Sequence, residues 1–254
     1  MTAGSEEPNA IVQVNDKTNR TEPNVRATEV EIYEGLEASS QNCWPSVNFD
    51  IGGINNAISA FLPAGFYYKT FMWPANFWEK YEYFIRHSAG LGKSPTEKDP
   101  DIYDHRNIHC DVLVVGAGIS GILAAKNAAK NNLKTLLVDE KNELGGATIY
   151  QNREFNKINN QNSSDWIKKE IKELKNIKNL EIKNRTSVAA YHGYNYLLAR
   201  ENLTEHSEKK DKHGKIRQRL LTIRAKKVIL ATGALERPLI FNKNDRPGIM
   251  LSSA

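Results

Sequence analysis

Apolar and polar positions are most informative between residues 111 and 148, where their pattern predicts a strand, a helix and a second strand. Residues 112–115 form an uninterrupted apolar run, and the sequence Gly-Ala-Gly-Ile-Ser-Gly follows at positions 116–121. A helical segment comes next, and a second apolar run at residues 135–138 ends on Asp139. A glycine turn between a buried strand and a helix, with an acid ending the next strand, is typical of dinucleotide-binding βαβ units.

Each glycine of this turn has a separate physical role. Gly116 permits the tight turn, Gly118 lets the backbone approach a pyrophosphate, and Gly121 lets the helix pack closely on the strand. The first N–H groups of the helix and its dipole then face the phosphate charge. Asp139 lies 18 positions after Gly121, where a carboxylate can accept hydrogen bonds from an adenosine ribose. The surrounding strand, helix and acid favour an adenine dinucleotide site over a glycine turn that binds nothing.

The residues leave open which dinucleotide binds. An acid at the end of the second strand repels a 2′-phosphate and disfavours NADP, although Lys141 beside it weakens that argument. A second glycine turn at Gly145-Gly146 follows, and a buried-type strand farther on ends at Thr232-Gly233. Both features are similar to those of flavoproteins with two dinucleotide folds. By residue type the site could hold FAD or NAD.

The order of the later elements predicts the fold class. We expect a helix near residues 166–175 with Ser163 or Ser164 as its cap, then strands at 180–183, 187–191, 194–201, 219–224 and 228–231. The short alternating pieces between 187 and 224 read as a β meander. A parallel sheet with a β-meander crossover indicates an α/β, Rossmann-like fold of the two-dinucleotide-binding flavoprotein type.

The chain before residue 109 divides into two parts. Residues 1–48 are polar, with strand-like alternation at 10–14 and 27–33 that suggests a small β unit. Residues 49–108 form an aromatic-rich connecting or interface segment, because 11 of the 22 aromatic residues lie between positions 61 and 84. These aromatics could pack onto the nucleotide domain of the same chain or onto another subunit. Residues 93–104 read as an exposed approach to the domain at 109–254.

Composition narrows the function classes. Lys and Arg number 35 against 30 Asp and Glu, a formal charge of +5, which is too mild an excess to indicate nucleic-acid binding. A solvated helix face at residues 168–178 and a hairpin tip at 209–219 account for much of it. Cys43 and Cys110 show no metal or iron–sulfur spacing and fit a reduced cytoplasmic setting. We expect no membrane span and no secretory signal.

Candidate catalytic residues are lacking. The six histidines show no ligand spacing and stand in charged or loop contexts, which predicts solvated side chains and no metal site. Glu236-Arg237 could touch a cofactor, but a surface ion pair is the favoured interpretation. We therefore assign no catalytic acid, base or nucleophile.

Four segments carry a resemblance to a known family. FLPAGFYYKTFMWP (61–74), FIRHSAGLGK (84–93), HCDVLVVGAGISG (109–121) and ATGALERPLIFNKNDRPGIMLSSA (231–254) resemble the α subunit of heterotetrameric sarcosine oxidase. The resemblance covers essentially the whole chain. That subunit is much longer, so the resemblance implies a fragment that opens in the tail of a ferredoxin-like domain and stops partway through the nucleotide fold.

The resemblance implies an activity and partners. The complex oxidises sarcosine to glycine with O2, giving hydrogen peroxide, and passes the methyl carbon to tetrahydrofolate. FAD lies in the β subunit, FMN at the α/β boundary and NAD in the α subunit, with β, γ and δ subunits as partners. The alternatives are a nucleotide-holding scaffold for assembly, or the α subunit of a related amine or opine oxidoreductase such as hydrogen cyanide synthase.

The resemblance also implies site residues. Those expected at the pyrophosphate are Gly116, Ala117, Gly118, Ser120 and Gly121. Asp139 and Glu140 are expected at the ribose. Further cofactor contacts are expected from Lys141, Gly146, Thr148, Val188, Thr232 and Gly233. Leu235 stands where the family has His, which removes any polar role for that position.

Overall fold

The computed structural model describes residues 11–15, 21–41, 43–46, 48–54, 73–92, 95–149, 157–207, 214–234, 239, 241–244 and 246–250. The chain forms two compact units. The nucleotide unit contains Ile102–Thr204 and the described residues from Ile216 onward. The N-terminal unit contains the described residues from Glu7–Asp101 together with those of Glu205–Lys215. The predicted boundaries near residues 48 and 108 stay predictions.

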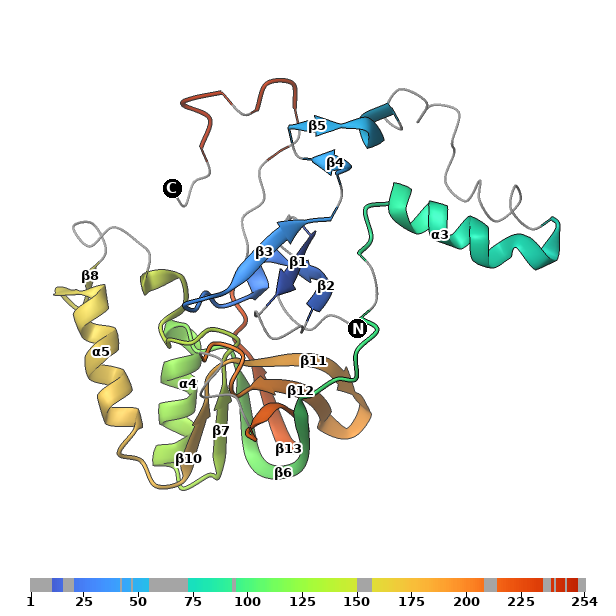
Figure 1. The fold of residues 1–254 in the computed structure, drawn as a ribbon. Helices are drawn as coiled ribbons and strands as arrows, with labels where there is room; N and C mark the ends of the chain where they lie inside the picture. Colours follow the sequence, from blue (N-terminus) through green and yellow to red (C-terminus); the bar gives the residue numbers. More distant parts are fainter. Residues whose placement is uncertain are drawn as a thin grey trace. The chain divides into compact units, whose positions relative to one another are not determined.

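A six-stranded sheet organises the nucleotide unit, in the order β10-β7-β6-β13-β12-β11 (Figure 1). Its strands are β6 (Ile102–Val115), β7 (Thr135–Val138), β10 (Leu180–Lys183), β11 (Thr186–His192), β12 (Tyr196–Asn202) and β13 (Ile216–Leu230). Strands β10, β7, β6 and β13 pair in parallel, whereas β13, β12 and β11 pair antiparallel. This mostly parallel sheet with a β meander confirms the predicted fold class.

Two helices cover one face of the parallel strands, α4 (Ile119–Lys130) and α5 (Ser163–Leu174) (Figure 1). Successive side chains of a strand point to opposite faces. Val112 and Val114 of β6 therefore pack in a cluster with α4 and α5, whereas Leu113 and Val115 pack with the meander strands β12 and β13. Burial on both faces explains the uninterrupted apolar run at 112–115.

Two strand predictions were wrong in their extent. The pieces expected at 219–224 and 228–231 form one strand, β13, and β6 begins at Ile102 instead of residue 112. These strands pair in parallel from Ile216 opposite Ile102 to Leu230 opposite Val115. Only the part covered on both faces is continuously apolar, so the apolar run marked only the last four residues of β6. β12 begins at Tyr196, because residues 193–195 form a 3-10 turn, η6.

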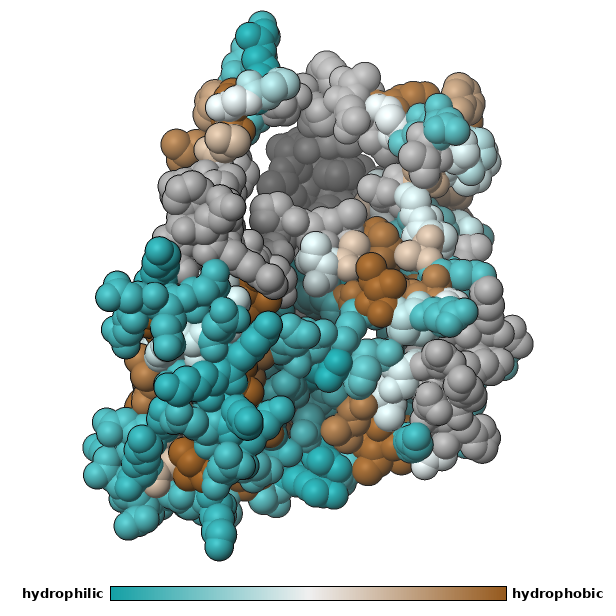
Figure 2. All heavy atoms as spheres, turned by 90° about the vertical axis from the view of Figure 1, so that its left-hand side faces the viewer, coloured by the Kyte–Doolittle hydropathy of each residue, from teal (hydrophilic) through white to brown (hydrophobic). Residues whose placement is uncertain are grey.

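Helix α5 was placed correctly, but its cap was not. Asn162 is the N-cap, and its side-chain oxygen accepts the N–H of Ser164 at 3.0 Å. Ser163 is buried in the first turn instead. The polar face of α5 is exposed at Lys168, Lys169 and Lys172, as predicted, and the side of the unit seen in Figure 2 is mostly hydrophilic.

The N-terminal unit contains a three-stranded antiparallel sheet in the order β2-β1-β3. Its strands are β1 (Ile11–Asn15), β2 (Thr21–Arg26) and β3 (Glu37–Ser40), and a small pair follows, β4 (Pro45–Ser46) with β5 (Phe49–Asp50). The strand expected at 27–33 was wrong. Ala27–Glu29 form a 3-10 helix, and Ile32 is 87% exposed, so the alternation there faces no core. The link to a ferredoxin-like domain stays a prediction.

The aromatic-rich segment is described only in part. Residues 55–72, which include half of the predicted aromatic run, lie outside the described residues. Helix α3 (Trp78–Ser88) contains no buried residue, and Trp78, Tyr83 and Phe84 are exposed on it. The rings of Tyr83 and Phe84 are nearly perpendicular, at 88°, with centroids 5.7 Å apart. What covers these aromatics stays a prediction.

Candidate dinucleotide-binding site

Three backbone segments meet where β6 ends. The N–H of Gly116 donates to the carbonyl of Val138 at 2.8 Å, which ties the glycine loop (residues 116–118) to the end of β7. The N–H of Gly145 donates to the carbonyl of Ala117 at 2.8 Å, and the N–H of Ala231 donates to the carbonyl of Val115 at 2.7 Å. Ligands of open parallel sheets bind at this carboxyl edge of the strands.

Two glycines of the motif at residues 116–121 are required by the protein itself. Gly116 has a φ of +97°, and a Cβ there would lie 2.3 Å from the carbonyl oxygen of Ala231. A Cβ on Gly121 would lie 1.8 Å from the carbonyl oxygen of Gly116, so the helix can approach the loop only without a side chain. The first and third glycines therefore have the packing roles expected of them.

Gly118 is different, because none of the described residues requires a glycine there. Its φ is −68°, which any residue adopts, and a Cβ would meet no atom of the described residues within 4 Å. The space beside Gly118 is therefore open. A glycine at this position would admit a group that binds against the backbone.

The open space lies at the N-terminus of α4. Gly118 is the N-cap residue and supplies no side-chain hydrogen bond to the first turn, while its carbonyl accepts the N–H of Ile122 at 2.9 Å. The first N–H groups of a helix lack partners within the helix and carry the positive end of its dipole. Ser120 is exposed in this turn. The arrangement suits an anionic group such as a pyrophosphate.

The second glycine turn lines the loop from the other side. A Cβ on Gly146, whose φ is +58°, would lie 3.0 Å from the Cα of Gly118. Gly145 has a φ of +131°, and a Cβ there would lie 2.8 Å from the side chain of Ile149. Thr148 is buried in η5 (Gly146–Ile149). The paired glycines thus let two stretches of backbone approach each other.

Asp139 takes part in the loop more directly than the sequence indicates. It is 9% exposed, and one carboxylate oxygen accepts the N–H of Ala117 at 2.5 Å. The other oxygen accepts the N–H of Lys141 at 2.8 Å. Each carboxylate oxygen has a second lone pair that a ribose hydroxyl can use. Asp139 therefore fixes the glycine loop to the end of β7, whatever it does for a ligand.

The remaining expected contacts are arranged less tightly. Glu140 and Lys141 are exposed, and Lys141 Nζ lies 3.9 Å from a carboxylate oxygen of Glu140. Val188 packs against the hydrophobic cluster that Leu113 and Val115 form with residues of β12 and β13. Thr232 lies near the loop, because its Cα would be 3.1 Å from a Cβ on Gly116. Gly233 is exposed just beyond it, with a φ of +71°.

Sequence reasoning missed a set of buried charges near this corner. Arg219 was expected at a solvated hairpin tip, but it is 9% exposed and pairs with Asp104 and Glu201. This correction has a physical reason. The partners are distant in sequence and meet only through strand register, which no local pattern reveals.

Side chains with catalytic or metal-binding character do not gather in the described parts of the chain. No group of three or more His, Cys, Asp or Glu residues suited to a metal ion occurs there. His105 is exposed, with Nε2 2.7 Å from the hydroxyl of Thr222. Leu235, Glu236 and Arg237 lie outside the described residues. None of the helices described has the length and apolarity to cross a membrane.

A comparison with protein families identifies the class. Residues 111–208 match the family described as FAD dependent oxidoreductase, and this range contains the glycine loop, Asp139 and the first two meander strands. The match, the strand order and the loop geometry define a dinucleotide-binding domain of the FAD-dependent oxidoreductase type.

The particular relatives confirm the resemblance found in the sequence. The chain is 46% identical over 255 residues to sarcosine oxidase subunit alpha of Rhizobium meliloti (strain 1021). This alignment covers 100% of this chain and 25% of that protein. It is 41% identical over 165 residues to sarcosine oxidase subunit alpha of Corynebacterium sp. (strain P-1), in an alignment that covers 65% of this chain and 17% of that protein. The chain thus spans about a quarter of the length of the first relative.

Among solved structures, the L-proline dehydrogenase from P. horikoshii aligns with a TM-score of 0.43 and 26% identity. The alignment covers 57% of this chain and 27% of that chain. The fold class rests on strand order and loop geometry and not on this likeness.

Proposed function

We propose that this protein holds NAD at the glycine loop and forms the NAD-binding part of a sarcosine-oxidising complex. One observation carries the proposal. Gly118 leaves open space at the N-terminus of α4, where no side chain of the N-cap residue occupies the first N–H groups. A pyrophosphate has the charge and the oxygen acceptors that such a terminus binds.

The expected roles of the residues follow from their positions. Gly116, Ala117, Gly118, Ser120 and Gly121 face the pyrophosphate through the backbone, and Asp139 and Glu140 serve the ribose. Lys141 and Thr148 are second-tier contacts, and Val188 flanks the adenine. Further cofactor contacts come from Gly146, Thr232 and Gly233. When bound, a nicotinamide or flavin supplies hydride transfer. The described residues of the chain bind and orient the nucleotide, and we assign no proton-transfer group among them.

The choice of NAD rests on the similarity to sarcosine oxidase α subunits. The glycine loop contacts the part that NAD and FAD share, so its geometry supports either. The buried carboxylate of Asp139 and the exposed one of Glu140 disfavour a 2′-phosphate, and therefore NADP.

The wider activity rests on the same similarity. The complex would oxidise sarcosine to glycine with O2, release hydrogen peroxide and pass the methyl carbon to tetrahydrofolate. FAD in a β subunit and FMN at the α/β boundary would carry the electrons, with γ and δ subunits completing a cytoplasmic heterotetramer.

A second candidate function is a scaffold that holds the nucleotide without turning it over. It is supported by Asp139, the buried acid of the corner, whose two carboxylate oxygens are engaged by backbone N–H groups. An acid used in this way stabilises the loop instead of exchanging protons.

Calorimetry of the intact protein with NAD, NADP and FAD tests the proposal. We expect NAD to bind more tightly than NADP. Adding sarcosine to the assembled complex with bound NAD then separates the two candidates, because reduced nicotinamide appears in the absorbance spectrum only if NAD turns over. Binding without reduction supports the scaffold, and no affinity for any adenine dinucleotide refutes both.

A further inference from the structure

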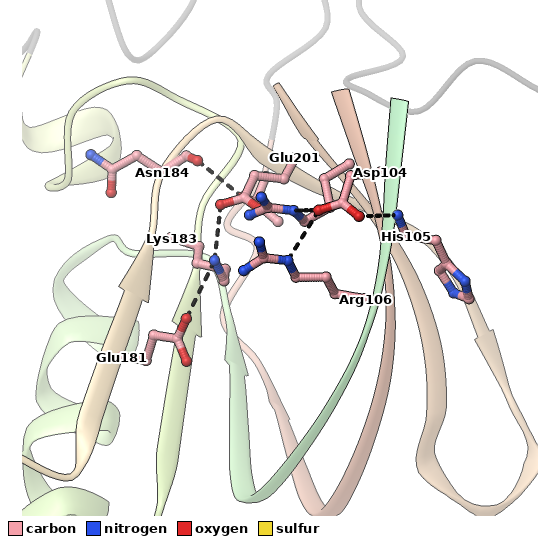
Figure 3. A network of polar contacts seen from close by, with 9 residues as sticks. Asp104, His105, Arg106, Glu181, Lys183, Asn184 and Glu201 are labelled. Atoms are coloured by element: carbon pink, nitrogen blue, oxygen red, sulfur yellow. Dashed lines mark hydrogen bonds and ion pairs between the residues drawn. The ribbon is translucent and has the colours of Figure 1, made fainter. Parts of the chain in front are cut away.

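Asp104, Glu201 and Lys183, which Figure 3 labels, form a row of charged side chains across the nucleotide unit together with Arg219. Asp104, Arg219 and Glu201 lie opposite one another on the adjacent strands β6, β13 and β12. Arg219 Nε lies 2.7 Å from an Asp104 oxygen, and another Arg219 nitrogen lies 3.1 Å from a Glu201 oxygen. Lys183, at the end of β10, completes this charged row with its Nζ 2.9 Å from the second Glu201 oxygen.

The charged row lies largely out of water. The side chains of Glu201, Arg219 and Lys183 are 9%, 11% and 13% exposed. Charges removed from water to this extent stabilise a fold only when each keeps its partners, and loss of one partner leaves an uncompensated charge. Glu201 is the shared member, because each of its oxygens pairs with a different cation. Neutralising Glu201 therefore disturbs both ends of the row.

The row is connected to Asp139 through the backbone. The N–H of Asp139 donates to the carbonyl of Lys183 at 3.0 Å. The N–H of Thr186 donates to the carbonyl of Asp139 at 2.7 Å, and Thr186 lies directly opposite Glu201 in the β11–β12 ladder. Both backbone groups of Asp139 are thus held by residues that belong to the row or pair with it.

The turn between β10 and β11 extends this connection. The N–H of Arg185 donates to the carbonyl of Lys141 at 3.0 Å. The side-chain amide of Asn184 donates to the carbonyl of Asn142 at 2.6 Å. The turn therefore holds residues 139–142 along their length. Asp139 in turn holds Ala117 of the glycine loop by its carboxylate.

We propose that the charged row positions the dinucleotide site from a distance. The Lys183–Glu201 pair holds the β10–β11 turn in place, the turn holds Asp139, and Asp139 holds the glycine loop for the pyrophosphate. Asp104, Arg219, Glu201 and Lys183 are positioning residues and touch no nucleotide. The inference rests on the proposed binding of an adenine dinucleotide.

The same unit contains a matched control. Lys126 of α4 pairs with Glu170 of α5 at 2.5 Å, with side chains 13% and 9% exposed, the same values as for Lys183 and Glu201. Each lysine also has a second, more exposed carboxylate, Glu173 for Lys126 and Glu181 for Lys183. Glu170→Gln therefore removes an equally buried charge from a pair that joins two helices instead of the ribose corner.

The test compares Glu201→Gln with Glu170→Gln in the intact protein. We expect both variants to melt at lower temperature than the wild type. Only Glu201→Gln should raise the Kd for NAD, by about tenfold, in calorimetry. In the protein without nucleotide, only Glu201→Gln should speed amide hydrogen exchange at Ala117, Asp139 and Thr186, by about tenfold. Equal Kd and equal exchange in the two variants would overturn the inference.

A second pair of variants covers the case in which Glu201→Gln does not fold. Lys183→Gln leaves Glu201 paired with Arg219 and is the milder change, and Lys126→Gln is its control. The same pattern is expected, and its absence again overturns the inference. If the wild type binds no adenine dinucleotide, the proposed function fails separately, and the exchange rates still decide whether the row positions the loop.

Discussion

Replacing Gly118 by Ala separates the ligand's requirement for glycine from the protein's own. The added methyl meets no atom of the described residues within 4 Å, and the backbone φ of −68° suits alanine. The same replacement at Gly121 would place a methyl carbon 1.8 Å from the carbonyl oxygen of Gly116. The two variants carry the same chemical change within one motif but meet different surroundings.

The magnitudes follow from those surroundings. At Gly118 the loss of unfolded-state entropy stabilises the fold by about 0.4–1 kcal/mol. The poorer N-capping by alanine costs a similar amount, so the free energy of unfolding should change by less than about 1 kcal/mol. A methyl group in the pyrophosphate space should cost about 1–3 kcal/mol of binding, roughly 5- to 150-fold in Kd. Gly121→Ala should instead cost about 1–3 kcal/mol or more of stability.

Thermal melts without nucleotide and calorimetry with NAD measure both quantities. We expect Gly118→Ala to melt within about 4 °C of the wild type and to bind NAD poorly. Gly121→Ala should melt clearly lower. If Gly118→Ala binds NAD as tightly as the wild type, the space beside Gly118 does not receive the pyrophosphate. If it melts as low as Gly121→Ala, that space is not open in the folded protein.

Three further outcomes are expected. Asp139→Asn should lower the free energy of unfolding without nucleotide by about 1–3 kcal/mol, because an amide cannot accept from both backbone N–H groups; an unchanged melt would contradict this. Burial raises the pKa of the Cys110 thiol to about 11. An alkylating reagent at about pH 8 should therefore label the partly exposed Cys43 before Cys110. Equal labelling rates for the two cysteines would refute this prediction. The Arg219 guanidinium lowers the pKa of Asp104 below its ordinary 3.8, so this pair stabilises the fold above that pH and the contribution is lost as pH falls through the lowered pKa. The difference in melting temperature between wild type and Asp104→Asn should therefore shrink below about pH 4. A constant difference would count against the ion pair.

Local pattern was sufficient to predict the strand, glycine loop and helix at this corner. The apolar run at 112–115, the glycines that follow and the apolar run ending at Asp139 each reflect the environment of nearby residues in the chain. The glycine spacing predicted a tight turn at Gly116 and a close approach of the helix at Gly121, and a Cβ would meet backbone atoms at both positions. The β meander was also foreseen, because alternation over short segments reports one buried face.

Strand limits could not be foreseen in the same way. β13 runs unbroken from Ile216 to Leu230 because β6 pairs with it along its whole length. That pairing joins residues more than a hundred positions apart. Polar residues in the middle of β13 interrupt its apolar pattern, yet the ladder of backbone hydrogen bonds continues past them.

The amino-acid sequence by itself determined the class of fold, the position of the glycine loop and the resemblance to sarcosine oxidase α subunits, because these depend on residue type and short spacing. Only the tertiary structure decided how Asp139 uses its two oxygens and how Arg219 becomes buried between Asp104 and Glu201. Hydrogen bonds and ion pairs of this kind depend on register between strands that are distant in the chain. Register is set by the packing of the whole sheet, so no local run of residues encodes it.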